Sequence, residues 1–296
     1  MNRTKRVYAL GFFDGVHLGH QTLLEECVRL AKELGCESAA ITFEKHPQSL
    51  YCTRVPPLIS TLSERNRLLK RYGIERILAL PVTDAVMNQP WQVFLEDLIS
   101  QGAAGFVCGH DFRFGYRGEG SATGLQTFCR ERNIPCVTVA EQTLDGLRIS
   151  STYIRQQLEE GDMATAVKFL GHPYALTGTV VHGKQLGRTL GIPTANLMLP
   201  EDLAIPKFGV YACRAILGDR AFPAVTNIGT RPTVSGFGIT VEPWILDFQG
   251  DLYGKTITLE FYFFLRPEKK FDTLTDLTTQ IHLDAQLTRE YLEEHL

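Results

Sequence analysis

Gly11-Phe-Phe-Asp-Gly-Val-His-Leu-Gly-His20 is the stretch that decides the fold of the first half of the chain. A short apolar run that ends at Leu10 precedes it, and a long amphipathic segment follows it. This order predicts a buried strand that passes through a glycine-hinged turn into the N-terminus of a helix. Such a terminus presents free backbone N–H groups and the positive end of the helix dipole, so the stretch predicts an anion-binding site.

Two histidines stand at the start of the predicted helix. His17 and His20 are three residues apart, so both are expected on one face of its first turn. Two imidazoles above an anion site suit a reaction in which charge develops on the phosphates of a nucleotide. A lone histidine is more often structural or simply exposed. The pair in this setting favours function, and we predict that both residues act at the site.

Size and composition limit what the chain can be. Its 296 residues are enough for two domains of ordinary size, each with its own core. A formal net charge of −3 gives no sign of attraction to nucleic acid or to a membrane. The first apolar run is too short for a signal peptide or a membrane span. The 7 cysteines form no Cys-x-x-Cys pair, which favours reduced thiols over a disulfide framework or a zinc site. We expect a cytoplasmic protein whose partners are small molecules; formation of a homo-oligomer stays open.

The two halves of the chain follow different patterns. Up to about residue 160, apolar and β-branched runs alternate with helix-like stretches. This alternation predicts a doubly wound parallel sheet with helices on both faces, which binds ligands at the carboxyl ends of its strands. The expected strands are residues 7–13, 38–43, 76–82, 105–109 and 135–140, and the expected helices are 19–34, 63–72, 91–100 and 121–132.

After about residue 172, short strand-like runs follow one another with turn signals between them. This pattern predicts a small antiparallel β-barrel, and the polar tail at 274–295 predicts a closing helix. The expected strands are residues 174–181, 209–217, 222–227, 238–248 and 256–264. A helical stretch at 156–170 belongs to either half. We predict domains at residues 1–165 and 166–296.

Two further segments of the first half carry candidate site residues. In Ile149-Ser-Ser-Thr-Tyr-Ile-Arg155, hydroxyls at a helix N-terminus and a guanidinium one turn later would form a second phosphate clamp, although an ordinary cap with a surface arginine explains them equally well. In Gly109-His-Asp-Phe-Arg-Phe-Gly115, Asp111 is a candidate for binding a hydroxyl or ring nitrogen, and Phe112 or Phe114 for stacking on a flat ring. Aromatic core beneath a polar turn is the alternative there.

The second half offers a glycine-rich loop and a carboxylate. Gly187-Arg-Thr-Leu-Gly-Ile-Pro-Thr-Ala-Asn196 predicts a flap that approaches phosphates, with Arg188 as a charge partner. Thr194 and Asn196 place two neutral oxygens on one side of an extended segment, which suits Mg²⁺. Glu242 stands in the middle of a predicted strand, either on its solvent face or in an apolar pocket where it transfers a proton. We expect the following Pro243 to disturb the pairing of that strand.

These motifs together resemble a known family. Phe-Asp-Gly-x-His-x-Gly-His and Ile-Ser-Ser-Thr-x-Ile-Arg resemble the adenylyltransferase module of bacterial bifunctional riboflavin kinase/FAD synthetases, which belongs to the nucleotidyltransferase superfamily. Leu-Gly-Arg-x-Leu-Gly-Ile-Pro-Thr-Ala-Asn, Asn-Ile-Gly-x-Arg-Pro-Thr and Val-Glu-x-x-Ile-Leu-Asp-Phe resemble the riboflavin kinase module. The matches run from about Gly11 to about Leu292. Trp244 departs from the family, in which histidine is commoner there.

The resemblance implies two reactions. The barrel would phosphorylate riboflavin to FMN with ATP and Mg²⁺, and the N-terminal domain would transfer AMP from ATP to FMN, giving FAD and pyrophosphate. The implied catalytic residues are Glu242 as the base in the kinase, and His17, His20 and Arg155 in adenylyl transfer. The implied nucleotide and phosphate ligands are Gly11, Phe13, Asp14, Gly19, Ser151, Thr152, Gly187 and Arg188. Asp111 and Phe112 would bind the flavin, and Thr194 and Asn196 the metal.

Three alternatives remain from the sequence. One of the two modules could have lost its activity, although all the motif residues are present. The chain could be a non-catalytic flavin-binding regulator, which would need neither the histidine pair nor Glu242. It could adenylylate another phosphate, which a riboflavin kinase module on the same chain argues against.

Overall fold

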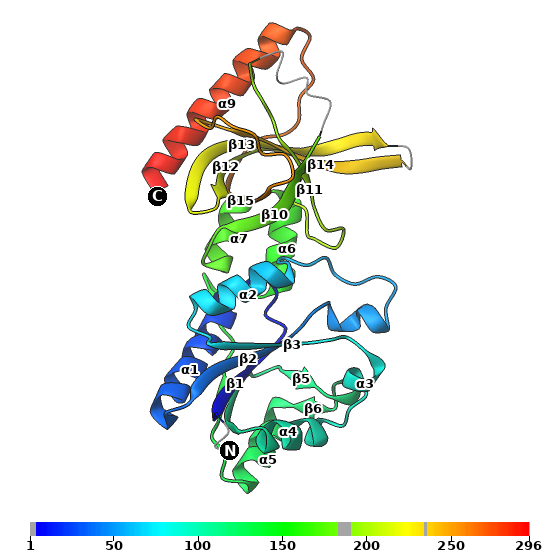
Figure 1. The fold of residues 1–296 in the computed structure, drawn as a ribbon, viewed down its shortest axis with the longest axis vertical. Coiled ribbons are helices and arrows are strands. Elements are labelled where there is room, and N and C mark those ends of the chain that lie inside the picture. The colour runs from blue at the N-terminus through cyan, green and yellow to red at the C-terminus, as the bar shows by residue number, and fades with distance from the viewer. Residues whose placement is uncertain (1–3, 183–190, 234–235, 296) are drawn as a thin grey trace. The chain divides into compact units, whose positions relative to one another are not determined.

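The computed structural model describes residues 4–182, 191–233 and 236–295. The chain forms two compact units, Met1–Ser151 and Thr152–Leu296. In Figure 1 the first unit is drawn in blue to green and the second in green to red.

The first unit is built on a five-stranded parallel sheet in the order β3-β2-β1-β4-β7. The predicted doubly wound sheet is confirmed. Its strands are β1 (Arg6–Leu10), β2 (Glu37–Phe43), β3 (Arg76–Leu80), β4 (Ala103–Gly109) and β7 (Cys136–Val139). Its helices are α1 (Leu18–Leu34), α2 (Leu62–Arg71), α3 (Asp84–Met87), α4 (Trp91–Ser100) and α5 (Ala122–Glu131). Shorter elements are η1 (Asp14–Val16), η2 (Pro47–Leu50), β5 (Arg113–Phe114), η3 (Tyr116–Gly118), β6 (Gly120–Ser121), β8 (Thr143–Leu144) and β9 (Leu147–Arg148).

Each face of this sheet has its own apolar core. Val7 and Ala9 of β1 pack in the core beneath α1 and α2, whereas Tyr8 and Leu10 pack in the core beneath α4 and α5. This alternation is the period of two that a strand imposes. It explains why β1 reads as a continuous apolar run, since both of its faces are buried. The helices cover the two faces of the sheet in Figure 1.

The order of the strands reverses beside β1, because the chain leaves β1 towards β2 on one side and returns to β4 on the other. Ligands of such sheets bind outside the carboxyl ends of the strands at this reversal. The prediction that the first strand reaches Phe13 is wrong, since β1 ends at Leu10. Phe13 has a φ of 57° and Gly15 a φ of 75°, a left-handed backbone that no strand accommodates.

The second unit is a closed barrel with helices, and the predicted antiparallel barrel is confirmed. Its described strands follow the order β10-β11-β14-β13-β12-β15. They are β10 (Tyr174–Val181), β11 (Asn196–Met198), β12 (Gly209–Leu217), β13 (Arg220–Thr233), β14 (Gly236–Ile245) and β15 (Thr256–Arg266). The sequence did not predict β11, which is three residues long and completes the barrel between β10 and β14.

The described helices of the second unit are α6 (Ser151–Glu160), α7 (Met163–Leu170) and α9 (Leu274–His295). The helical stretch predicted at 156–170 is two helices, because Gly161 takes a φ of 82° and Asp162 caps α7. The predicted boundary between residues 165 and 166 lies within α7. The extent of the two domains stays a prediction.

Two predictions about β14 are corrected. The strand ends at Ile245, short of the predicted residue 248. Pro243 does not disturb the pairing, since β13 and β14 stay in register from Ala224↔Ile245 through Thr226↔Pro243 and beyond. The proline takes part through its carbonyl oxygen, which accepts a hydrogen bond from the Ala195 N–H at 2.9 Å. That role needs no N–H from proline.

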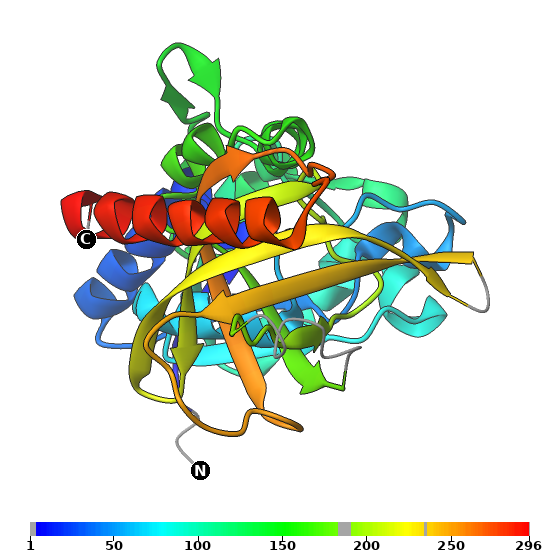
Figure 2. The ribbon, with the colours of Figure 1, turned by 90° about the horizontal axis from the view of Figure 1, so that it is seen from above.

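Helix α9 packs across β12 and β13, as Figure 2 shows in red over the yellow strands. Ala285 of α9 lies in one apolar cluster with Val210 and Val225 of those strands. An ion pair joins the helix to the end of β15, where Arg266 Nη2 lies 2.7 Å from Asp284 Oδ2. The Asp284 side chain is 2% exposed, so this pair is shielded from water.

We expect Asp284→Ala to destabilise the second unit by about 3 kcal/mol, because it leaves the Arg266 charge in a poorly hydrated place without its carboxylate. Thermal and urea unfolding followed by circular dichroism measure the loss. Arg289→Ala is the control, since Arg289 of the same helix pairs with Asp247 on the exposed surface. That pair should contribute less than about 1 kcal/mol. Equal losses from the two variants would show that burial does not set the strength of the Arg266–Asp284 pair.

Candidate active sites

The turn between β1 and α1 places the two predicted histidines side by side. His17 caps α1, and its Nδ1 accepts a hydrogen bond from the His20 N–H at 3.3 Å. The two imidazole rings stack with their centroids 3.7 Å apart and their planes 13° from parallel. A neutral His17 whose Nδ1 accepts carries its proton on Nε2. The structure therefore brings the pair together on one face of the first turn.

The environment of His20 determines its charge and its tautomer. Removal from water, with smaller contributions from the charges of His17 and Arg65, lowers the pKa of His20 well below its usual 6.5. The imidazole is therefore neutral at neutral pH. Among the described residues, its buried Nδ1 has no hydrogen-bond partner. A buried lone pair without a donor is tolerated better than a buried N–H without an acceptor, so we infer that Nε2 carries the proton.

Phe13 and Asp14 hold this turn in place. The Phe13 side chain is fully buried in the core under α1. The Asp14 carboxylate is also buried, and it accepts hydrogen bonds from the N–H groups of Ile59 and Ser60 at 3.0 and 3.1 Å. The Gly15 N–H donates to Ser60 Oγ at 2.9 Å. Both side chains are thus buried in the protein interior, and their predicted contact with phosphate stays a prediction.

A polar pocket of about 180 Å³, here called the histidine pocket, opens beside this turn. Three segments line it: the start of α1, the end of β4 and the chain from β7 to α6. Predicted site residues His17, Gly19, His20, Asp111 and Ser151 are among its lining residues. Ser151 Oγ also donates to the carbonyl oxygen of Asp14 at 3.0 Å, which ties the second predicted phosphate segment to the first.

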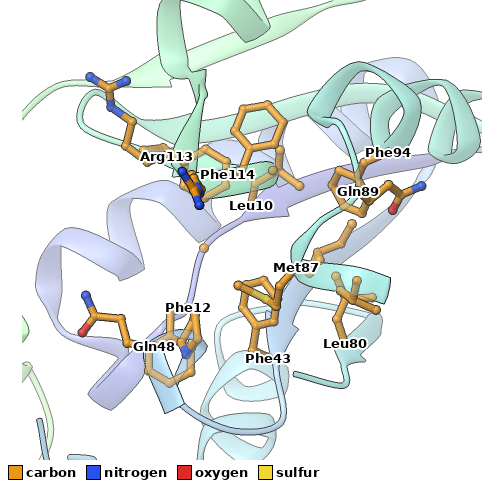
Figure 3. A pocket seen from close by; sticks show the side chains of 18 of the residues that line it. Leu10, Phe12, Phe43, Gln48, Leu80, Met87, Gln89, Phe94, Arg113 and Phe114 are labelled. Carbon is orange, nitrogen blue, oxygen red and sulfur yellow. The ribbon is translucent and has the colours of Figure 1, made fainter. Parts of the chain in front are cut away.

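A larger pocket of about 560 Å³, the aromatic pocket, lies at the same carboxyl edge of the sheet. Figure 3 shows its side chains, with Phe12 and Phe43 on one side and Phe94 and Phe114 on another. The predicted residues Gly11, Asp111 and Phe112 also line it. Phe112 stacks on Phe114 with ring centroids 5.1 Å apart. Asp111 lines both pockets, so they are neighbours.

Charged residues gather where these two pockets meet. Arg148 Nη2 forms an ion pair with Asp111, and Arg148 Nε lies 3.1 Å from Glu141 Oε2. His110 Nε2 lies 3.8 Å from the same carboxylate oxygen. Neither Arg148 nor Glu141 was predicted from the sequence. Residues 37 apart in the chain form the Arg148–Asp111 pair, so no local pattern reveals it.

The barrel has a pocket of its own, about 230 Å³, here called the barrel pocket. Its lining residues include Thr194, Asn227, Glu242, Trp244 and Glu268. Glu242 and Asn227 face each other across β13 and β14, and Asn227 Nδ2 donates to Glu268 Oε1 at 3.3 Å. Glu242 is half-buried and lines the pocket, whose walls carry both apolar and charged side chains, and its role as a base stays a prediction. Asn227 was not among the predicted site residues.

Comparison with known proteins identifies the family. Residues 1–153 match the family model of FAD synthetase, and residues 170–292 match that of riboflavin kinase. The chain is 34% identical to the bifunctional riboflavin kinase/FMN adenylyltransferase of Listeria monocytogenes, over 97% of this chain and 92% of the relative. It is 36% identical to the Escherichia coli protein of the same name, over 96% of this chain and 92% of that one. This chain belongs to the bifunctional riboflavin kinase/FMN adenylyltransferase family.

A solved structure has the same fold along almost the whole chain. It is named as a macrolide-efflux protein from Streptococcus pneumoniae, and it matches with a TM-score of 0.88 and 31% sequence identity. The match covers 97% of this chain and 94% of that one. Within the described part of the present family member, no helix is long and apolar enough to cross a membrane.

The structure describes some of the remaining predicted site residues of this family member and not others. Gly187 and Arg188 lie outside the described residues. Thr152 and Arg155 lie in α6 of the second unit, and their predicted role in phosphate binding stays a prediction. Thr194 lines the barrel pocket and a neighbouring pocket of about 250 Å³. Asn196 begins β11, two residues further on.

The donor set at Thr194 and Asn196 fits Mg²⁺. The cation prefers oxygen ligands and keeps several waters or substrate phosphates, so one hydroxyl and one amide oxygen are a sufficient protein contribution. Across the described ranges, no group of three or more histidine, cysteine, aspartate or glutamate side chains could hold a metal ion.

Proposed function

We propose that the chain makes FAD from riboflavin in two ATP-dependent steps, one on each unit. The observation that carries the proposal is that each unit has a pocket of its own. His17 and His20 line the histidine pocket, and Glu242 lines the barrel pocket, which supports one step on each unit. The family supports both activities. We propose functional domains of residues 1–165 and 166–296, acting in the cytoplasm on small molecules, without nucleic-acid or membrane partners.

In the kinase step, the 5′-hydroxyl of riboflavin attacks the γ-phosphorus of ATP, giving FMN and ADP. Glu242 accepts the proton of that hydroxyl, and Asn227 orients the polyol chain beside it. The apolar part of the barrel pocket, with Trp244 held edge-on against His282 of α9 at a centroid distance of 5.6 Å, receives the flavin ring. Thr194 and Asn196 would hold Mg²⁺, which neutralises phosphate charge when bound. Gly187 and Arg188 would contact the phosphates.

In the adenylyl step, the phosphate of FMN attacks the α-phosphorus of a second ATP, and pyrophosphate leaves. The attacking phosphate is already an anion, so the step needs no general base. The step requires hydrogen-bond donors that face the charge on the transferred and leaving phosphates. His17 and His20 supply Nε2–H groups at the α1 N-terminus, and Gly19 and Ser151 border the same pocket. The motif adds Thr152 and Arg155 as further phosphate ligands.

The flavin ring of FMN is proposed to lie in the aromatic pocket. The ring is flat and apolar on its faces, and Phe112 and Phe114 offer aromatic surface to it. Asp111 borders both pockets, which supports a position for its carboxylate between the ring and the phosphates. Its carboxylate would bind the flavin after exchanging its ion pair with Arg148, and Arg148 would then be released towards phosphate.

The experiment that tests the function is a time course. The purified protein is incubated with riboflavin, ATP and Mg²⁺, and the flavins are separated chromatographically. FMN should form first and FAD should follow. FMN alone would mean that the histidine pocket is inactive. No conversion of riboflavin, with FMN supplied separately also unchanged, would leave a flavin-binding regulator as the better interpretation.

We expect Phe112→Ala to raise the KM for FMN about fivefold in FAD formation, because the loss of one stacking ring costs on the order of 1 kcal/mol. Riboflavin phosphorylation on the same chain should not change. Tyr116→Ala is the matched control, since Tyr116 is an aromatic residue of the same loop that does not line the pocket. Equal effects of the two variants would place the flavin elsewhere.

A further inference from the structure

Arg65 is a buried cation to which the two proposed steps give no role. It lies in α2, and its side chain has no solvent exposure. Burial of a guanidinium is costly unless the protein binds it well, so such a residue calls for a physical reason. Nothing in the sequence distinguishes Arg65 from its neighbours, because it sits in an ordinary polar helix pattern. Its surroundings connect it to the adenylyl site.

The guanidinium joins the ends of two neighbouring strands. Arg65 Nη1 donates to the carbonyl oxygen of Phe43 at 2.8 Å and to Thr42 Oγ1 at 3.1 Å, both at the carboxyl end of β2. Thr42 Oγ1 in turn donates to the carbonyl oxygen of Phe12 at 2.7 Å. The guanidinium carbon also lies 4.3 Å from the centroid of the Phe12 ring. Arg65 thus contacts the Phe12 ring directly and the Phe12 carbonyl oxygen through Thr42. Phe12 lies in the turn between β1 and α1, residues 11–17, here called the histidine turn.

The chain just before α2 holds the same turn further along. Its Ser60 N–H donates to the Asp14 carboxylate, and its Ser60 Oγ accepts from the Gly15 N–H. The ring of Phe13, which precedes these two attachments, meets the His20 ring edge-on at a centroid distance of 5.3 Å. Helix α2 and the residues before it therefore fix the backbone that carries His17 and His20.

Arg65 also acts on His20 through its charge. Desolvation, the charge of His17 and the charge of Arg65 all lower the pKa of His20. The other titratable and charged groups at the histidine pocket are His110, Asp111, Glu141 and Arg148. Arg148 pairs with both carboxylates, so these acidic groups are compensated locally. Of the two side chains whose charges lower the pKa of His20, Arg65 is the one that stays charged at every physiological pH.

We propose that Arg65 is a positioning residue for adenylyl transfer, whose guanidinium fixes the histidine turn and the electrostatic environment of His20. The inference rests on the proposed function of the histidine pocket. Its chemical consequence concerns the form in which His20 meets the triphosphate. A neutral imidazole with its proton on Nε2 donates one directed hydrogen bond, and it loses no proton during the reaction.

The decisive variant is Arg65→Met, which keeps apolar volume and removes the charge. We expect kcat for FAD formation to fall roughly 10- to 100-fold, as when a preorganised site loses one electrostatic component. The imidazole of His20 should titrate at a higher pH than in the wild type, because a positive charge that disfavours its protonation is gone. Nuclear magnetic resonance of the histidine rings measures this titration, and the spectrum of His20→Gln assigns the His20 signal.

Two further variants separate charge from geometry. Thr42→Val removes the hydroxyl that links Arg65 to Phe12 but keeps the charge, so the His20 titration should stay at the wild-type pH. Arg65→Lys keeps the charge but loses the planar guanidinium that lies over the Phe12 ring, so kcat for FAD formation should fall several-fold without a comparable shift of the titration. Riboflavin phosphorylation by the same chain should be unchanged in all three variants.

The outcomes are separable. An unshifted His20 titration in Arg65→Met would overturn the inference even though the wild type makes FAD. If Arg65→Met does not fold, wild-type kcat in Arg65→Lys would overturn it instead, and a several-fold loss would support it. Failure of the wild type to convert FMN into FAD would be a failure of the proposed function itself, which the time course detects before any variant is made.

Discussion

Glu242→Gln is expected to lower kcat for riboflavin phosphorylation by about a thousandfold and to leave the conversion of FMN into FAD unchanged. General bases typically contribute between about a hundredfold and ten-thousandfold, and glutamine has nearly the same shape as glutamate but accepts no proton. Glu242 lines the barrel pocket opposite Asn227, where a substrate hydroxyl can reach both side chains. The amide should still bind riboflavin, so KM should change much less than kcat.

The measurement is the initial rate of FMN formation, with FAD formation from added FMN as the internal control. Glu260→Gln is the matched variant, because Glu260 is also a half-buried carboxylate of the barrel and lies outside the pocket. It bonds to Tyr262 and should leave kinase activity near the wild-type value. A similar loss in both variants would mean that Glu242 acts on the stability of the barrel. Wild-type kcat in Glu242→Gln would exclude Glu242 as the base.

His20→Ala is expected to lower kcat for FAD formation by about a hundred- to a thousandfold, the range for removal of one donor that faces developing charge. Because Nε2 of His20 is inferred to carry the proton, a second variant tests whether this side chain acts as a hydrogen-bond donor. His20→Gln carries a neutral N–H at about the same distance from the backbone, so it should retain more activity than His20→Ala. A side chain that acted as a proton acceptor would not be replaced in this way, because an amide nitrogen is not basic.

The lowered pKa of His20 adds a prediction about pH. A histidine with the usual pKa would gain a proton as the pH falls through about 6.5, whereas His20 stays neutral below that value. The part of the FAD-forming rate that depends on His20 should therefore be level from about pH 8 to about pH 6. The ratio of wild-type to His20→Gln rates across that range measures this part of the rate.

Equal loss of kinase and FAD-forming activity in His20→Ala would contradict the division of labour between the units.

Local patterns were sufficient for much of this protein. The alternation of apolar runs with amphipathic stretches predicted the parallel sheet, because a strand buried on both faces and a helix buried on one have different hydrophobic periods. The spacing of His17 and His20 predicted that they share a helical turn, and the structure stacks their rings. The motifs around them indicated the family. Each of these inferences depends on residues that are close in sequence.

The corrections have a common cause. The strand predicted to reach Phe13 stops at Leu10, because the turn is held in a left-handed backbone by contacts with Ile59 and Ser60. Pro243 stays within β14, because its carbonyl has a partner on a segment far away in the chain. Local propensity cannot anticipate either outcome, since the deciding partner comes from elsewhere in the fold.

Fold class, family and the candidate residues that lie within short motifs could be inferred from the order of amino acids. Three further facts needed the folded chain: which face of β14 carries Glu242, that Asp111 borders two pockets, and that Arg65 lies under the histidine turn. This division arises because short motifs carry the chemistry, whereas pocket walls and buried charges are assembled from strands and helices that meet only on folding. A buried arginine in a polar helix looks like any surface arginine until its neighbours are known.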